Sequence, residues 1–428
     1  MQRDLLKAQF AKLPHLPAIH PDQQLEELDD DEAEESLDSF PAELSSSAPR
    51  APRRRIPPGA DYSPLSGSSY FSTALEVDVP ISSIYQPLPP ASPSNSSGSS
   101  GTAQFRVYYT PPPLASSSSA LDDDDDEDEE GAGSGKGVVF VCVHGAGYSG
   151  LSWACLAKEL AEPAGGEGRK GRVGVLAYDA RGHGKTTLPP PSAGESTTVD
   201  LSLQTQSNDL YELLKAVYPD RAEAPSLVLV GHSMGGAVVA DACNRIQKDV
   251  ADVTGVVVVD VVEGTAIDAL PGMAALIAGH PKTFTSPEDA IAWHLQSRTI
   301  NNPQSARLSV PPLVMPSASS SEGEEEYVWR VDLAETEPYW RGWFTGLSAK
   351  FLACRAAKLL LLAGTDRLDR ELLIGQMQGK YQLEVDPHVG HCVHEDAPER
   401  TAETLLSFWE RNDRTDVLKG VKKVGAPA

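Results

Sequence analysis

The chain has 428 residues, 40% of them hydrophobic, and a formal net charge of −25. This excess of acidic groups argues against nucleic acid or an anionic membrane as the main partner, because both would repel the chain. Ser, Pro, Asp and Glu dominate the first ~135 residues, which leaves roughly 280 residues for one large folded domain. We therefore predict a domain over residues 101–412 that follows a largely disordered region over residues 1–100.

Two acidic clusters account for much of the charge. One spans Asp22–Glu35, and the other, Asp122–Glu130, consists of nine consecutive acidic residues. Such blocks repel themselves and stay solvated, so they favour disordered segments over a site for a basic partner. We assign the second block to a disordered insertion over residues 111–136, and we expect a flexible tail over residues 413–428.

The five cysteines show no Cys-x-x-Cys spacing. This pattern is typical of free thiols in a reducing compartment and indicates neither a disulfide framework nor a zinc site. The N-terminus lacks the apolar stretch of a signal peptide, and no run approaches the ~18 apolar residues that cross a bilayer. We predict an intracellular protein, in the cytoplasm, the nucleus or both, without membrane association.

Apolar runs alternate with helical patterns from residue 137 onward. Before them, Tyr62–Phe71 carries enough aromatic surface to pack onto a folded body, and Phe105–Tyr109 resembles a first edge strand. The later runs are short and nearly continuous, as in strands buried on both faces of a parallel sheet. Their alternation with helices predicts an α/β fold with a mostly parallel central sheet flanked by helices. The predicted strands are 138–143, 173–178, 226–230, 256–259, 359–363 and 381–385, and the predicted helices are 151–160, 200–217, 236–247 and 397–411.

The interval from about residue 264 to residue 352 interrupts this alternation and is rich in tryptophan. An insertion at this place would lie over the carboxyl edge of the sheet, where ligands bind in such folds. We interpret it as a helical cap with a mobile polar loop near residues 315–326. The same aromatic residues could also simply fill a core.

The segment Gly231–Gly235 reads Gly-His-Ser-Met-Gly, with Ser233 at its centre. A strand candidate precedes it, and a run of small residues that permits close helix packing follows it. Strand, sharp turn and helix form the nucleophile elbow of the α/β-hydrolase fold, which makes Ser233 the predicted nucleophile. A structural turn is the alternative.

A serine hydroxyl needs a nearby base to remove its proton. His391 lies after the final strand candidate and just before a helix signal, where this fold places its catalytic histidine. His394 lies about one turn further along and is better placed as a helix-entry residue, and His388 follows a proline in the loop.

Two carboxylates compete to orient this histidine. Asp260 follows the strand at 256–259, and Asp366 follows the strand at 359–363. Both satisfy the chain order serine, acid, histidine, and the fold more often uses the later position. Either residue could instead cap a helix or a turn.

An acyl transfer also needs N–H donors for the developing oxyanion. We expect one from Met234, directly after the nucleophile, and the other from Ala146 or Gly147 in the loop after the first central strand. The turn that begins at Asp179 is expected to brace the site. No dinucleotide-binding or phosphate-binding motif and no metal-ligand cluster is apparent, so we expect neither a cofactor nor a metal.

The chain closely resembles the protein phosphatase methylesterase family. The most specific matching runs are Asp260–Ala266 (Asp-Val-Val-Glu-Gly-Thr-Ala) and Ile374–Lys380 (Ile-Gly-Gln-Met-Gln-Gly-Lys). Gly231–Gly236, Tyr327–Arg330 and Gly390–Pro398 match as well, so the resemblance spans most of residues 100–411. The Ser/Pro-rich and acidic insertions and Ala146, where a glycine is more usual, depart from the family.

The resemblance implies a Ser233–His391–Asp260 triad, because the family's catalytic aspartate falls in the run that begins at Asp260. It also implies hydrolysis of the methyl ester on the C-terminal leucine of the protein phosphatase 2A catalytic subunit, with release of methanol. The implied partner is that phosphatase, and we expect a monomer. The alternatives are a broad small-molecule carboxylesterase and a non-catalytic protein that binds and inhibits the phosphatase.

Overall fold

The computed structural model describes residues 61–82, 100–113, 137–162, 173–191, 198–318, 326–364 and 368–413. The following structural statements refer to these residues. The acidic block at Asp122–Glu130, the middle of the polar cap loop, Asp366 and the tail from residue 414 lie outside them.

Within the described residues, eight strands form the central sheet in the order β1-β2-β4-β3-β5-β6-β10-β11. The pairs β1–β2 and β2–β4 are antiparallel, and all other neighbours are parallel. The predicted mostly parallel α/β sheet is therefore confirmed. The strands are β1 (Thr73–Ser82), β2 (Ser100–Thr110), β3 (Val138–Val143), β4 (Val173–Tyr178), β5 (Ser226–His232), β6 (Val253–Val259), β10 (Ala357–Leu362) and β11 (Gln382–Val385).

The edge of this sheet differs from the sequence-based prediction. Strand β1, within the region that we assigned to disorder, forms the edge, and the segment predicted as the first strand belongs to β2. Only one face of β1 is buried, at Val79 and Ile81, and its neighbours are exposed. Pro80 interrupts the strand pattern, yet an edge strand tolerates proline because one side of its backbone needs no partner.

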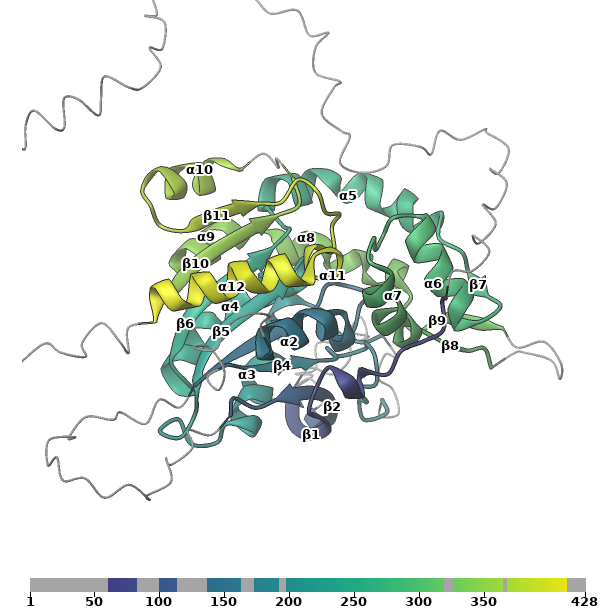
Figure 1. Cartoon of the computed structure of the whole chain (residues 1–428), viewed down its shortest axis with the longest axis horizontal. Helices are drawn as coiled ribbons and strands as arrows, with labels where there is room; N and C mark the ends of the chain where they lie inside the picture. Colours follow the sequence, from purple (N-terminus) through teal and green to yellow (C-terminus); the bar gives the residue numbers. More distant parts are fainter. Residues whose placement is uncertain are drawn as a thin grey trace, which may run out of the picture. The chain divides into compact units, whose positions relative to one another are not determined.

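Helices cover both faces of the sheet (Figure 1). Helices α2 and α12 pack on one face, and α3, α4, α8 and α9 pack on the other. Each face encloses an apolar cluster, since the parallel strands point buried side chains in both directions. The helices of the described chain are α2 (Ala154–Ala161), α3 (Leu203–Val217), α4 (Met234–Asp249), α5 (Glu263–Ala278), α6 (Pro287–Gln296), α7 (Pro303–Ser309), α8 (Glu337–Phe344), α9 (Leu347–Ala353), α10 (Arg370–Met377), α11 (Val393–Asp396) and α12 (Pro398–Asn412), with 3-10 turns η2 (Gly67–Ser69), η3 (Gly150–Trp153), η4 (Pro311–Leu313) and η5 (Leu333–Thr336).

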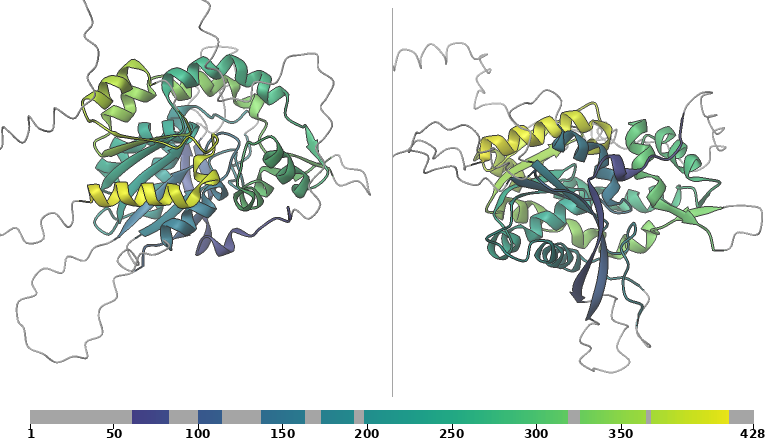
Figure 2. Two further views of the ribbon diagram at one scale, coloured as in Figure 1. Left: turned by 45° about the horizontal axis from the view of Figure 1, so that its top comes forward. Right: turned by 60° about the horizontal axis from the view of Figure 1, so that its bottom comes forward.

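The segment between β6 and β10 contains helices α5 to α9 and a small sheet of order β7-β9-β8. Helices α6 and α7 and this small sheet lie to one side of the main sheet (Figure 2). Trp293 and Trp329 contact Phe284 in a cap cluster of its own, whereas Trp340 and Trp343 pack into the main core. The tryptophans are thus divided between the inserted segment and the main core. The small strands are β7 (Thr283–Phe284), β8 (Val314–Pro316) and β9 (Tyr327–Trp329).

The aromatic segment before β1 packs onto the folded body, as its composition predicted, with Phe71 buried in the apolar cluster under α2 and α12. The N–H of Leu65 donates to the carbonyl of Arg307 at 2.9 Å, and the Arg307 side chain donates to the carbonyl of Ser63 at 2.7 Å. In the described part of the chain, no helix combines the length and the apolar character that crossing a membrane requires.

Candidate active site

Ser233 lies in the sharp turn between β5 and α4. Its φ of 51° and ψ of −119° lie in a region that a non-glycine residue rarely adopts. The surrounding backbone is crowded, because a Cβ atom on Gly231 would approach the Gly235 carbonyl oxygen to 2.1 Å. The N–H of Ser233 donates to the Val259 carbonyl at 3.0 Å, which ties the turn to β6. The predicted elbow is therefore present.

His391 and Asp260 meet across 131 positions of sequence. Nδ1 of His391 lies 2.6 Å from Oδ2 of Asp260, and the histidine side chain is 48% exposed while the aspartate is 12% exposed. A carboxylate only accepts hydrogen bonds, so Nδ1 carries the proton and Nε2 is the accepting nitrogen of the ring, as a general base requires. The structure therefore places Asp260 against His391, and the competing acid, Asp366, lies outside the described residues.

Backbone contacts hold Asp260 in this orientation. It is a second non-glycine residue with a positive φ, at 50°. Its N–H donates to the Leu361 carbonyl at 2.7 Å, and its Oδ1 accepts the Ala363 N–H at 2.7 Å. The neighbouring strand β10 thus fixes the carboxylate, and Oδ2 remains for the histidine.

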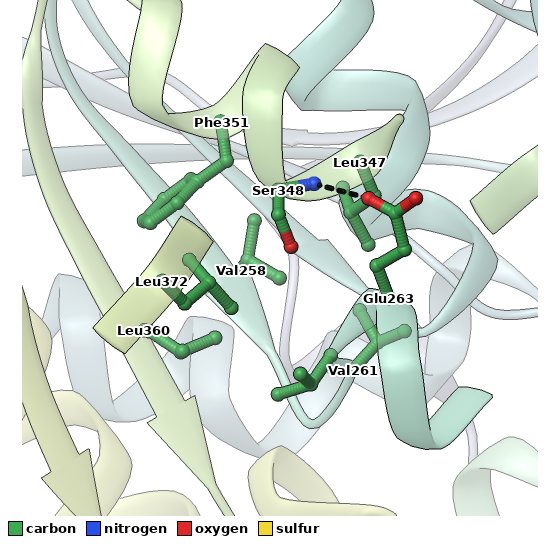
Figure 3. Close-up of a pocket in the computed structure, with 9 residues that line it drawn as sticks. Val258, Val261, Glu263, Leu347, Ser348, Phe351, Leu360 and Leu372 are labelled. Carbon is green, nitrogen blue, oxygen red and sulfur yellow. Dashed lines mark hydrogen bonds between the residues drawn. The ribbon is translucent and has the colours of Figure 1, made fainter. Parts of the chain in front are cut away.

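The residues after Asp260 anchor this loop to helix α9. Val261 lines a small apolar pocket together with Val258 and Leu360 (Figure 3). Glu263 reaches the start of α9, where its carboxylate accepts the N–H groups of Gly346 at 2.8 Å and Ser348 at 3.0 Å. These contacts therefore fix the segment that follows Asp260 against the start of α9.

The two candidate oxyanion donors in the loop after β3 differ in their hydrogen bonds. The Gly147 N–H donates to Nε2 of His183 at 3.0 Å, and Nδ1 of His183 donates to the Arg181 carbonyl at 2.9 Å. Burial lowers the pKa of His183, which keeps this ring neutral and its Nε2 an acceptor. Since the Gly147 N–H is occupied, we retain Ala146, together with Met234 at the start of α4, as the proposed donors. His183 lies in the turn that we expected to brace the site, but no local pattern identifies this particular contact.

The turn at Asp179 braces the same loop, as predicted. The Asp179 carboxylate accepts the N–H groups of Gly150 and Lys185, both at 2.8 Å, and the Tyr108 hydroxyl at 3.3 Å. His144 packs beside it, with Nε2 accepting the Ala180 N–H at 2.9 Å. Burial and the neighbouring His183 lower the pKa of His144 to about 3, which suits a structural role.

The other two histidines of the final loop lie elsewhere. His394 is fully buried in α11 and stacks on Trp153, with ring centroids 3.9 Å apart. His388 is exposed, and its N–H donates to Asp386. All five cysteines are free and buried. Among the described residues, no group of three His, Cys, Asp or Glu side chains is arranged to hold a metal ion.

Comparison with known proteins agrees with this architecture. Residues 140–404 match the model of the alpha/beta hydrolase family. A peroxisomal α/β-hydrolase of Saccharomyces cerevisiae, known from its crystal structure, shares the fold with a TM-score of 0.54 and 15% identity, over 83% of this chain and 92% of that one. This likeness concerns the fold alone.

Two fungal relatives are much more similar in sequence, and both are named protein phosphatase methylesterase 1. The protein of Cryptococcus neoformans var. neoformans serotype D is 42% identical over 98% of this chain and 94% of the relative. The protein of Gibberella zeae is 48% identical over 66% of this chain and 68% of the relative. The chain is a carboxylic ester hydrolase that belongs to the protein phosphatase methylesterase 1 family of α/β-hydrolases.

Proposed function

We propose that this protein removes the methyl ester from the C-terminal leucine of the protein phosphatase 2A catalytic subunit. The names of its relatives support a phosphatase ester as the substrate. The observation that carries the mechanism is the 2.6 Å hydrogen bond between His391 and Asp260, taken together with the elbow conformation of Ser233. This arrangement is that of an acyl-transfer site with a covalent intermediate.

In the proposed first step, the Ser233 hydroxyl oxygen attacks the ester carbonyl while Nε2 of His391 takes its proton. Asp260 stabilises the imidazolium that forms and stays ionised itself. The N–H groups of Met234 and Ala146 donate to the carbonyl oxygen as it gains negative charge. The carbon–oxygen bond to the methoxy group then breaks, His391 returns its proton to that oxygen, and methanol leaves.

In the second step, a water molecule replaces the alcohol. His391 takes a proton from the water, which attacks the acyl-enzyme carbonyl, and the Ser233 oxygen leaves with the proton that His391 returns. The products are the free leucine carboxylate and the regenerated serine. Neither step calls for a cofactor or a metal.

Recognition in this proposal depends on more than the ester. A methyl group offers little surface to bind, so specificity has to come from a pocket for the leucine side chain near the cap and from contact with the folded phosphatase. We propose that the protein acts as a monomer in the cytoplasm, the nucleus or both, without a nucleic acid or membrane partner.

The test is methanol release from carboxymethylated phosphatase 2A by the full chain. Ser233→Ala should lower turnover by about 10⁴-fold, because it removes the nucleophile. Ser407→Ala, on α12 and outside the site, is the matched control and should turn over normally. Near-normal demethylation by Ser233→Ala would contradict the serine mechanism.

Two further measurements distinguish the alternatives. High efficiency on short aryl esters together with none on the methylated phosphatase would indicate a small-molecule esterase. Phosphatase binding without labelling of Ser233 by a fluorophosphonate would indicate a non-catalytic inhibitor.

A further inference from the structure

One carboxylate joins the cap to the loop that carries the proposed base. Oδ1 of Asp396 accepts the backbone N–H of Asn301 at 2.7 Å, and Oδ2 accepts the Asn301 side-chain amide at 2.6 Å. The same Oδ2 accepts the N–H of Gly390 at 2.7 Å. All three partners are N–H donors, so the position suits a group that only accepts.

The hydrogen bond between Asp396 and the Gly390 N–H fixes the backbone directly before His391. Gly390 precedes His391, and the carbonyl of His391 in turn accepts Nε2–H of His232 at 2.9 Å. The backbone is therefore held on both sides of the imidazole, by Asp396 before it and by His232 after it. A Cβ atom on Gly390 would lie 3.1 Å from both the Asn301 amide and the Asp396 carboxylate, so glycine lets the three groups meet.

The contact to Asn301 acts on the cap. Asn301 lies in the short segment between α6 and α7, next to Ile300, which is fully buried in the cap cluster together with Cys392. A second bond runs in parallel, from the Ser305 hydroxyl on α7 to the Glu395 carbonyl at 2.7 Å. Helix α11 therefore joins the cap, through Asn301 and Ser305, to the histidine loop, residues 386–392, through Gly390.

We propose that Asp396 is a positioning residue for the reaction, which sets the backbone of His391 and makes its placement depend on the position of the cap. The inference rests on the proposed function, because it assumes that His391 is the base. A displacement of about 1 Å at a catalytic group can cost about 10²-fold in rate. Loss of the Asp396 contacts is thus expected to lower the rate of the chemical step and to leave substrate affinity nearly unchanged.

The experiment compares four variants of the full chain on methylated phosphatase. Asp396→Ala and Asp396→Asn should lower kcat by about 10²-fold with KM within about threefold, because ground-state binding does not need the base. Asn301→Ala keeps both backbone N–H bonds to Asp396 and should lose much less. Asp386→Ala is the matched control. It removes the acceptor of the His388 N–H in the same loop and of the Arg400 side chain, but among the described residues Asp386 has no bond to Gly390 or to the cap.

A spectroscopic signature separates positioning from simple loss of stability. The Nδ1 proton of His391, in its short bond to Asp260, should give a far-downfield proton resonance that Asp396→Ala weakens or removes below the melting temperature. The double variant Asn301→Asp/Asp396→Asn restores the side-chain bond to the cap with donor and acceptor exchanged, but it leaves the Gly390 N–H opposite an amide. Its thermal stability should recover and its kcat should stay low.

Three results would overturn the inference: recovery of kcat together with stability in the double variant, an equal loss in Asp386→Ala, or unchanged kcat in both Asp396 variants. These outcomes leave the proposed function intact as long as Ser233→Ala remains inactive. Full activity of Ser233→Ala would instead remove the proposed function itself.

Discussion

At the scale of single residues, backbone strain coincides with the proposed chemistry. Ser233 and Asp260 both have positive φ angles, and each such residue costs about 1–3 kcal/mol unless its surroundings enforce it. Hydrogen bonds to neighbouring strands enforce both, through the carbonyls of Val259 and Leu361. For Asp260, the side chain held in this way is the one that meets His391.

Asp260 is expected to hold the imidazole of His391 in the tautomer that the reaction requires. Asp260→Asn should lower kcat by about 10⁴-fold, because an amide cannot hold the imidazole in the required tautomer. The fold should persist, since an amide oxygen can still accept the Ala363 N–H. Methanol release at saturating substrate measures the loss, and circular dichroism checks the fold.

Asp366→Asn and Asp268→Asn are the comparisons for this prediction. Asp366 was the competing acid, and Asp268 is an exposed residue of α5. Both variants should retain most of the activity. A greater loss in Asp366→Asn than in Asp260→Asn would reverse the assignment of the acid.

At the scale of elements, helix α4 brings the nucleophile and the acid together. A Cβ atom on Gly236 would lie 3.0 Å from Val261 and 3.1 Å from Val258, so the start of this helix lies close against the end of β6. Ser233 directly precedes the helix, and Asp260 directly follows the strand. Small residues after the elbow therefore set the spacing between two parts of the site.

The anchor of the acid loop gives a prediction at this scale. Glu263→Ala removes the acceptor for two N–H groups at the start of α9 and should destabilise the protein by about 0.5–2 kcal/mol, as the loss of a helix cap does. Urea denaturation measures this change. Glu337→Ala is the control. Glu337 is the first residue of α8, a helix whose N-terminus has no side-chain cap hydrogen bond to lose, so this substitution should have a smaller effect. Equal stability of the Glu263→Ala variant and the unaltered chain would contradict the anchor.

At the scale of the whole molecule, buried neutral histidines make stability depend on pH. Burial lowers the pKa of His294 to about 4 and that of His394 to about 3. In the unfolded chain a histidine ring takes up its proton near pH 6.5. In the folded chain these two rings stay neutral at that pH, because their pKa values are lower. The contribution of these two histidines to the free energy of unfolding is thus fully present above about pH 6.5, and it declines as the pH falls toward about 3 to 4.

His394 allows a direct test of this pH dependence. Its ring stacks on Trp153, and neither ring nitrogen has a hydrogen-bond partner among the described residues. His394→Phe should keep the stacking, cost little at pH 7.5, and reduce the slope of stability between pH 4 and 6 by up to about 1.4 kcal/mol per pH unit. Urea titrations at several pH values measure the slope, and an unchanged slope would mean that His394 is protonated in the folded state.

Much of the fold could be predicted because the buried strands leave a local pattern. The runs at 138–143 and 173–178 coincide with β3 and β4, since a strand buried on both faces is apolar at every position. Strand β1 was missed for the opposite reason. It buries alternate residues only and contains Pro80, so its pattern does not differ from that of a polar linker.

The elbow around Ser233 and the alternation of strands and helices were determined by the sequence alone, because each depends on neighbours within a few positions. For the acid, chain order left Asp260 and Asp366 open, and the family resemblance implied Asp260. Only the tertiary structure shows the contact of His391 with Asp260, the occupation of the Gly147 N–H by His183 and the three bonds of Asp396. These contacts join loops that parallel strands bring to one edge of the sheet from distant parts of the chain. Pairing across such distances depends on the packing of the whole sheet, and no local pattern encodes it.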